Sequence, residues 1–297
     1  MRSARALLRT LRPHQWVKNL FVAAPLVFAK KLTSPSTALA ALAAVLAFCA
    51  LSGAVYAVND VLDAPKDRLH PSKRNRPVAA GALSARAAVT AAAILAVLAL
   101  AGAALLQPGF AAVAAGYLAL NLVYSLWLKR VAFVDVTALA ACFLLRVLGG
   151  AYAIQVFPSP WLLACTALLA AFLGFGKRAH ELAQATAASA SGGLGSTRAV
   201  LSQYRPGHLR VALYVLGAAT SIAYALYTRA AHTVAFFGTG RMLWTVPFCV
   251  VGIARFLYLA MRKEGADSPT EEMLRDWPFM TNLGLWGLAV LAIIYYR

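Results

Sequence analysis

Acidic residues are scarce in this chain, since only 10 Asp and Glu stand against 28 Lys and Arg among its 297 residues. Charged residues of both signs make up 13% of the sequence, whereas 61% is hydrophobic and the mean hydropathy is +0.70. Soluble globular domains carry about 25% charged residues, so this composition excludes a soluble globule. The sequence therefore predicts an integral membrane protein.

Cysteine and histidine are also sparse. The four cysteines (Cys49, Cys142, Cys165 and Cys249) are widely spaced and lie inside apolar runs. The five histidines (His14, His70, His180, His208 and His232) show no ligand spacing either. This pattern excludes a zinc motif and a disulfide scaffold.

Apolar runs of the length that spans a bilayer, about 20 residues, recur along the chain. They cover roughly residues 17–33, 36–58, 85–106, 108–126, 131–154, 159–176, 208–229, 242–262 and 279–296. We therefore expect an all-α, polytopic membrane protein with about nine transmembrane helices.

The distribution of basic residues predicts the orientation. The N-terminal segment and the loops after every second expected helix hold 21 of the 28 Lys and Arg residues. Because basic loops stay on the cytoplasmic side, we expect a cytoplasmic N-terminus in the cell membrane. Most of the net charge of +18 follows from this bias, so it does not indicate a nucleic-acid partner. The arginines before the first run predict a basic helix lying on anionic headgroups.

Three of the ten acidic residues lie within the nine-residue run from Asn59 to Asp67. If the preceding helix continues through this run, Asn59, Asp63 and Asp67 share one face, and Asp60 lies beside it. Like charges at this spacing repel unless a cation offsets them, and Mg²⁺ takes carboxylate oxygens together with phosphates. The run therefore predicts a magnesium site, with a solvated, charge-balanced loop as the alternative.

Basic and polar residues elsewhere suit the binding of an anionic substrate, because guanidinium groups clamp phosphate and polar residues inside spans are functional hypotheses. The candidate substrate-binding residues are Lys18, Asn19, Asn59, Lys73, Arg74, Arg76, Tyr124, Lys129, Asp135, Arg146, Lys177, Arg178 and Glu181. Two alternatives stay open. Asp135 and Arg146 could join helices, and the basic pair at 177–178 could anchor a helix end before a Ser/Gly/Ala linker at 185–197.

The pattern NDxxDxxxD after the second expected helix, with a second polar segment after the sixth, resembles the UbiA superfamily of intramembrane prenyltransferases. The resemblance also rests on LRPHQWVKNL, NDVLDAPKDRLHPSKRNRPVAAG, RVLGGAYA, GKRAHEL and EEMLRDWPF, and it covers nearly the whole chain. It implies a single UbiA-type bundle over residues 1–297, with a central cavity that faces the cytoplasm.

One departure from the superfamily concerns the substrate. Aromatic prenyltransferases of this type carry a second acid-rich motif, DxxxD, where this chain has Lys177-Arg178-Ala179-His180-Glu181. The pattern is similar to the members that transfer 5-phosphoribose from PRPP to a polyprenyl phosphate such as decaprenyl phosphate, releasing diphosphate, for the synthesis of cell-envelope arabinose donors. The resemblance then implies that Asp60, Asp63 and Asp67 are catalytic and hold Mg²⁺ against the diphosphate of PRPP.

Two other functions remain. A prenyltransferase that alkylates an aromatic or other small acceptor has the same fold, although it predicts a second set of metal-binding carboxylates. A transporter or channel would favour ionisable residues near the bilayer midplane. The chain length of the lipid, a possible homo-oligomer and the role of the acidic loop 264–276 stay open.

Overall fold

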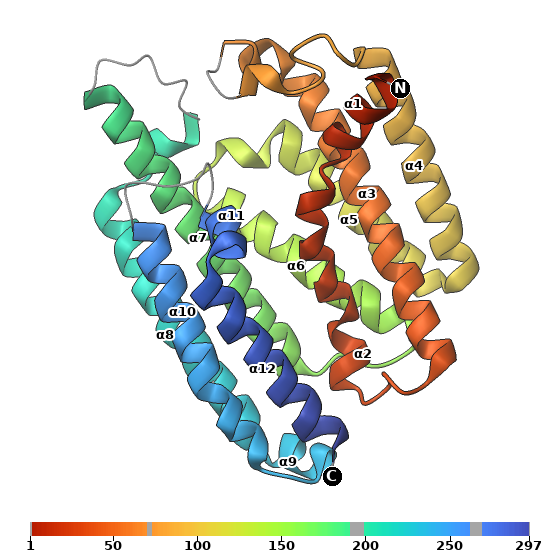
Figure 1. Cartoon of the computed structure of the whole chain (residues 1–297), viewed down its shortest axis with the longest axis vertical. Helices are drawn as coiled ribbons and strands as arrows, with labels where there is room; N and C mark the ends of the chain where they lie inside the picture. The colour runs from red at the N-terminus through yellow and green to blue at the C-terminus, as the bar shows by residue number, and fades with distance from the viewer. Residues whose placement is uncertain (1, 70–72, 191–198, 262–268, 297) are drawn as a thin grey trace. The chain divides into compact units, whose positions relative to one another are not determined.

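The computed structural model describes residues 2–69, 73–190, 199–261 and 269–296, and every element in these ranges is helical (Figure 1). The α-helices are α1 (Arg2–Leu11), α2 (Ala24–Phe28), α3 (Pro35–Asp67), α4 (Ala85–Leu106), α5 (Pro108–Leu126), α6 (Val134–Ala153), α7 (Pro160–Ala190), α8 (Pro206–Arg229), α9 (Ala231–Phe237), α10 (Val246–Met261), α11 (Pro269–Arg275) and α12 (Trp277–Tyr295). The 3₁₀ helices are η1 (Pro13–Ala23), η2 (Lys73–Asn75), η3 (Leu128–Arg130), η4 (Ala199–Gln203) and η5 (Arg241–Thr245). The expected all-α class is confirmed.

Eight helices in the described ranges are long and apolar enough to cross a membrane. They correspond to eight of the nine expected spans, so a multi-pass membrane protein is confirmed. Two of them are longer than expected. α3 continues past residue 58 to Asp67, and α7 continues past residue 176 to Ala190.

The first expected span, at 17–33, is not among these eight, because the structure has two helical elements there, η1 up to Ala23 and α2 from Ala24 to Phe28. The backbone of Arg12 lies in the left-handed region, with φ 52° and ψ 62°, and Pro13 then begins the 3₁₀ helix η1. A second proline, Pro25, stands at the start of the short helix α2. Proline supplies no amide proton and clashes with the preceding turn of an α-helix, which accounts for the change from 3₁₀ to α geometry next to Pro25, while Ala23 and Ala24 keep a right-handed helical backbone.

The chain divides into two compact units. The first comprises Met1–Lys129 with Cys142–Pro158, and the second comprises Arg130–Ala141 with Ser159–Arg297. Helix α6 contributes its first turns to the second unit and the remainder to the first.

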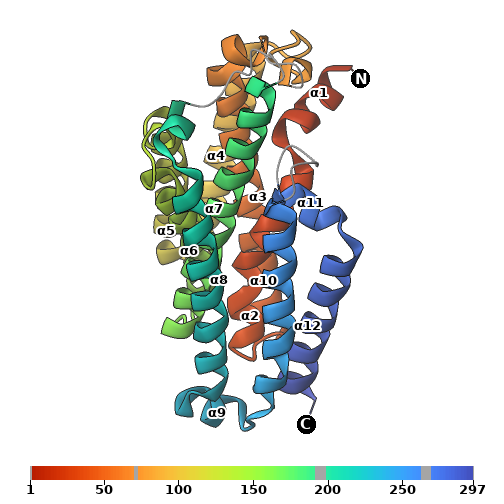
Figure 2. The same ribbon diagram turned by 90° about the vertical axis from the view of Figure 1, so that its left-hand side faces the viewer.

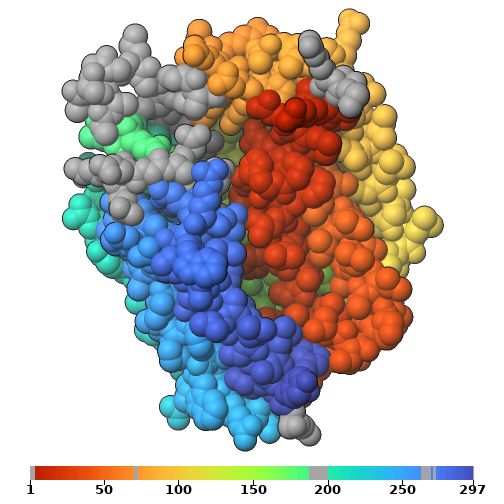
Figure 3. All heavy atoms as spheres, in the orientation of Figure 1, coloured from red at the N-terminus to blue at the C-terminus, as the bar shows by residue number. Residues whose placement is uncertain are grey.

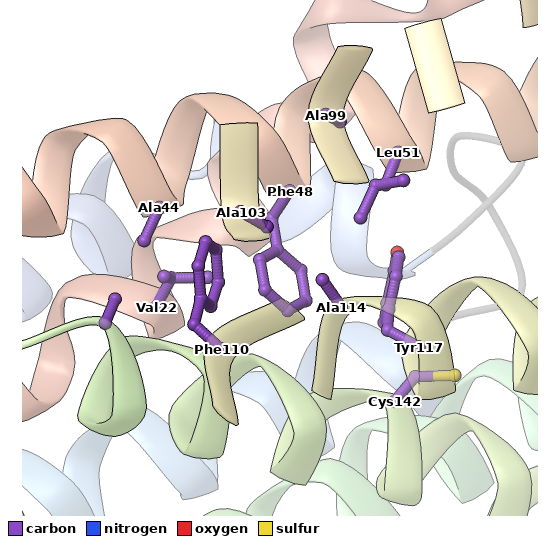
Figure 4. Close-up of a cluster of buried hydrophobic side chains, with 11 residues drawn as sticks. Val22, Ala44, Phe48, Leu51, Ala99, Ala103, Phe110, Ala114, Tyr117 and Cys142 are labelled. Atoms are coloured by element: carbon purple, nitrogen blue, oxygen red, sulfur yellow. The ribbon is translucent and has the colours of Figure 1, made fainter. Parts of the chain in front are cut away.

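In the first unit, α3 packs against α4, α5 and η1. The core of this unit, drawn in Figure 4, centres on the rings of Phe48, Phe110 and Tyr117. The ring centroids of Phe48 and Tyr117 lie 4.9 Å apart. Helix α6 reaches this core because Gly150 has no side chain: a Cβ there would lie 1.8 Å from the carbonyl oxygen of Val22.

In the second unit, α7 packs along α8, and α10 packs against both α8 and α12. Figure 2 shows these long helices running side by side. Their core is built around Phe172 and Phe256, whose ring centroids lie 5.0 Å apart. A smaller cluster holds η4 in place, with Val200 and Tyr204 buried beside Phe175 of α7.

Candidate active site

The acid-rich run forms the C-terminal end of α3, which confirms that the helix continues through Asn59 and Asp67. Asp60 is buried, with a side chain that is 1% exposed, and Asp67 is nearly as enclosed. Asp63 is more open, with 35% of its side chain exposed. A carboxylate as enclosed as Asp60 is costly unless a cation accompanies it.

Each of the three carboxylates meets a basic side chain from another segment of the first unit. Asp60 forms an ion pair with Arg12, at the junction of α1 and η1. The Nη1 atom of Arg76 lies 2.7 Å from Oδ2 of Asp67 and 3.7 Å from Oδ1 of Asp60. The Nζ atom of Lys129 lies 3.0 Å from Oδ1 of Asp63. The acidic end of α3 is therefore surrounded by three cations.

The expected convergence of the carboxylates on one point is not found in the described residues, where no three His, Cys, Asp or Glu side chains come together. The physical reason is that the acids face different partners. Asp60 and Asp67 are two turns apart and share Arg76, whereas Asp63 turns toward Lys129.

The donor types nevertheless suit Mg²⁺. The side-chain oxygen Oδ1 of Asn59 is buried and has no hydrogen-bond partner among the described residues. A buried amide oxygen without a donor needs an explanation, and together with carboxylate oxygens it makes the hard ligand set that Mg²⁺ prefers. Asn59, Asp60, Asp63 and Asp67 are the residues that would hold such an ion.

A second polar cluster lies inside the first unit around Arg146, which is 5% exposed. Its Nε donates to Oδ1 of Asn19 at 2.9 Å, and its Nη2 donates to the hydroxyl of Tyr117 at 2.8 Å. The guanidinium also lies 4.8 Å from the centroid of the Tyr117 ring. Asn19, which is fully buried, donates in turn to Ser52 at 3.1 Å. The structure therefore brings Asn19 and Arg146 together, two residues that the sequence marked separately.

A third cluster lies in the second unit around the fully buried Arg178. Its Nε lies 2.6 Å from Oδ2 of Asp135, and its Nη1 forms an ion pair with Glu181. The hydroxyl of Tyr204 donates to Oδ1 of Asp135 at 2.6 Å and accepts from the backbone N–H of Phe133 at 2.7 Å. Burial, with the Asp135 carboxylate as a further cause, raises the pKa of Tyr204 above its usual value.

This cluster changes the interpretation of two candidates. Arg178 already faces two carboxylates, so its charge is offset within the protein, whereas the sequence suggested that it binds an anion. Asp135 and Arg146 lie on one helix, as expected, but their partners differ: Arg178 and Tyr204 for the first, and Asn19 and Tyr117 for the second.

The remaining candidates are spread over the first unit and α7. Lys18 is half-buried and donates to Oε1 of Gln15 at 2.6 Å. Arg74 is exposed on η2, next to the half-buried Lys73. Tyr124 on α5 and Lys177 on α7 are also half-buried.

Parts of two predicted loops lie outside the described residues, namely 191–197 of the Ser/Gly/Ala linker and 264–268 of the acidic loop. His70 also lies outside them. The rest of the acidic loop is helix α11 and Asp276, which pairs with Arg255 at 2.7 Å and caps α12. His180 is buried, with its Nε2 3.0 Å from Nε2 of Gln184. The four cysteines are free, as expected.

Sequence reasoning missed three functional contacts. Arg12 was recognised only as part of a basic segment, yet it pairs with Asp60. Tyr117 lies among apolar residues and Tyr204 in the polar run 202–205, and nothing in the sequence pairs them with Arg146 or Asp135. The one available signal was Pro13, which marks a break in the backbone directly after Arg12.

Comparisons with known proteins agree with this architecture. A family model described as the UbiA prenyltransferase family matches residues 19–283. The chain is 33% identical over 282 residues to the decaprenyl-phosphate phosphoribosyltransferase of Mycobacterium tuberculosis. The match covers 91% of this chain and 88% of that protein. The chain is 30% identical over 298 residues to the protein of the same name from Corynebacterium glutamicum. This match covers 98% of this chain and 87% of that protein.

The fold is similar to that of a UbiA homolog from Archaeoglobus fulgidus, solved bound to GPP and Mg²⁺. The TM-score is 0.71 at 20% identity, with 97% of this chain and 99% of that chain covered. At this identity the likeness concerns the fold alone.

Proposed function

We propose that this chain, which belongs to the UbiA prenyltransferase family and is a multi-pass membrane transferase, moves 5-phosphoribose from PRPP to a polyprenyl phosphate such as decaprenyl phosphate. The observation that carries the proposal is the 33% identity to the mycobacterial decaprenyl-phosphate phosphoribosyltransferase along nearly the full length of both chains. The product would serve the synthesis of cell-envelope arabinose donors.

The acid-rich end of α3 is the proposed place for the diphosphate of PRPP. Asn59, Asp60, Asp63 and Asp67 would hold Mg²⁺, which when bound neutralises the charge that develops on a departing diphosphate. Arg12, Arg76 and Lys129 already lie within ion-pair distance of these carboxylates. A diphosphate at this position would therefore meet three fixed cations.

In the proposed transfer, a phosphate oxygen of the lipid attacks C1 of the ribose. A C1–O bond to the lipid phosphate forms as the C1–O bond to diphosphate breaks, and the leaving diphosphate takes the bonding electron pair. The lipid phosphate is already ionised near neutral pH, so no strong base is required. The main work of the protein is to hold two anions in contact.

The other basic candidates divide into two roles. Lys18, Lys73, Arg74 and Lys177 are proposed to offset the repulsion between the two anionic substrates. Arg178 is proposed as a positioning residue, because Asp135 and Glu181 enclose its guanidinium. Through these contacts it would fix the turn of α7 that carries Lys177.

We place the protein in the plasma membrane as one UbiA-type domain, with its N-terminus in the cytoplasm. The basis is the distribution of Lys and Arg along the sequence and the tendency of basic loops to remain cytoplasmic.

A two-substrate assay on detergent-purified protein tests the proposal. One tube receives Mg²⁺, labelled PRPP and polyprenyl phosphate, and the other receives Mg²⁺, a prenyl diphosphate and 4-hydroxybenzoate. We expect label to move from PRPP into the lipid phase and this transfer to stop when EDTA is added. No transfer in the first tube, from protein whose melting transition shows that it is folded, would contradict the proposal.

The second tube examines the alternative function, transfer of a prenyl group to an aromatic or other small acceptor. The match of residues 19–283 to the model of the UbiA prenyltransferase family supports this alternative. A prenylated product there, without transfer from PRPP, would establish it.

A further inference from the structure

A separate cavity of about 470 Å³ lies in the first unit, between α1 and the segment that follows α3, and its walls are mostly alanine and proline with two arginines and one asparagine. Arg5 and Arg9 line it from α1, and Asn75 and Pro77 line it from the facing segment. Figures 1 and 2 show α1 and this segment at the same end of the unit, and their surfaces adjoin on the face drawn in Figure 3. The volume falls within the range of small-molecule pockets, about 300 to 1,000 Å³.

The two walls of the cavity are fixed by buried contacts. On α1, Ala6 and Thr10 are buried and hold the helix in place. Arg5 and Arg9 directly precede these two residues and are one turn apart, so both lie at the surface on the side of the cavity. The opposite wall is a compact turn in which the N–H of Ala80 donates to the carbonyl of Arg76 at 2.8 Å. The cavity therefore exists before any ligand arrives.

The cavity also differs in charge from the acid-rich end of α3. Two guanidinium groups and one amide line it, and no acidic side chain is among the described residues that do. Arg76, between the two lining residues Asn75 and Pro77, instead pairs with Asp67 and Asp60. The acids of α3 are thus offset by other bases, and the charge of Arg5 and Arg9 is left for a ligand.

We propose that this cavity binds the phosphate monoester of a small phosphorylated ligand. Each guanidinium presents paired donors that match phosphate oxygens, and the Asn75 amide can donate to a neighbouring hydroxyl. Two sources carry this chemistry: a soluble phosphorylated sugar and the headgroup of a lipid that ends in a phosphate. The first source rests on the proposed function, in which PRPP carries a 5-phosphate besides its diphosphate.

Calorimetric titration of the detergent-purified full chain tests the site, without Mg²⁺ and without polyprenyl phosphate. The probes are ribose 5-phosphate and dihexanoyl phosphatidate, with ribose and dihexanoyl phosphatidylcholine as counterparts that lack a phosphate monoester. The test variant is Arg5→Gln with Arg9→Gln. The matched control is Arg86→Gln, because Arg86 is exposed at the start of α4, in the same unit, and does not line the cavity.

We expect saturable binding of one phosphate-bearing probe, an affinity lower by about tenfold or more in the double variant, and no change in the control. Ribose 5-phosphate as the bound probe would assign the sugar source, and phosphatidate would assign the lipid source. Binding of neither probe, or equal weakening in both variants, would overturn the site. If the double variant does not fold, Arg5→Lys with Arg9→Lys keeps the charge, loses the paired donors, and should still weaken binding.

This outcome is independent of the transfer assay. If wild-type protein moves label from PRPP to lipid but the arginine variants bind both probes normally, the cavity proposal fails and the proposed function stands. If the probes bind through Arg5 and Arg9 while wild-type protein transfers nothing from PRPP, the proposed function fails and the cavity remains a phosphate site.

Discussion

Arg146 and Asn19 are 127 residues apart in the chain, yet Nε of Arg146 donates to Oδ1 of Asn19 at 2.9 Å. This contact ties α6 to η1, and the two glycines that follow Arg146 bring the same helix close to the core. A Cβ on Gly149 would lie 2.6 Å from the ring of Phe48, and one on Gly150 would lie 1.8 Å from the carbonyl oxygen of Val22. The RVLGG motif is thus a packing and anchoring device as well as a sequence signature.

Gly150→Ala should destabilise the protein strongly, because the added methyl group meets backbone, which cannot rotate away. We expect a loss of about 3 kcal/mol or more, at the upper end of overpacking effects, seen as a lower melting midpoint in detergent. Gly116→Ala on α5 is the matched control, because nothing lies within 4 Å of its added methyl group. Because alanine favours a helix over glycine, a melting midpoint in Gly150→Ala as high as that of the control would contradict the close contact with Val22.

Arg146→Met should also destabilise the protein, because it leaves the acceptor atoms of Asn19 and Tyr117 without their buried donor. Each such loss costs about 1 to 3 kcal/mol, partly offset because a buried cation is removed. Thermal unfolding in detergent measures the net effect. Arg146→Lys keeps the charge but cannot reach both acceptors in the same geometry, so we expect an intermediate midpoint. A methionine variant as stable as wild type would show that the network contributes little to folding.

The sequence predicted the elements that depend on composition. Eight spans follow from apolar runs. The helical continuation through Asn59 to Asp67 was only a condition of the expected shared face, and the structure meets it. The sequence did not predict that the first span is built from η1 and α2, nor that Arg12 adopts a left-handed conformation directly before Pro13, because a hydropathy pattern carries no information on backbone geometry.

The partners of the charged residues could not be predicted for a different reason. Asp63 and Lys129 are 66 residues apart, and Asp135 and Tyr204 are 69 apart. Such pairs are set by tertiary packing, and a single sequence shows only that polar residues are unusual in apolar surroundings. That signal was enough to mark Asp135 and Arg146, but not their tyrosine partners.

Tyr204→Phe should loosen the attachment of η4 to α6, because the hydroxyl both donates to Asp135 and accepts from Phe133. We expect a loss of about 1 to 3 kcal/mol at neutral pH. Burial raises the pKa of Tyr204, so the folded protein keeps its proton where the unfolded chain, with a pKa of about 10, loses it. This contribution to stability is complete below about pH 10 and declines as the pH rises further.

Melting curves of wild type and Tyr204→Phe between neutral pH and about pH 11 separate these effects, because the other titrating groups cancel in the difference. The difference in melting midpoint between wild type and Tyr204→Phe should become smaller above about pH 10. A difference in melting midpoint that does not depend on pH would contradict the raised pKa of the Tyr204 hydroxyl. It would not contradict the hydrogen bonds of that hydroxyl.

Asp63 and Lys129 allow a structural role to be separated from a catalytic one. The charge exchange Asp63→Lys with Lys129→Asp keeps an ion pair at this position, whereas Asp63→Asn removes it. If Asp63 holds Mg²⁺ and diphosphate as proposed, both variants should lose transfer from PRPP by about a hundredfold or more, since neither presents a carboxylate at position 63. Lys129→Gln alone should retain metal-dependent transfer with a higher KM for PRPP, because it removes only a cation that faces the site.

The melting midpoint should fall in Asp63→Asn and return toward wild type in the exchanged variant. Transfer that returned along with the midpoint would show that Asp63 acts through its ion pair and would leave the metal role to Asp60 and Asp67.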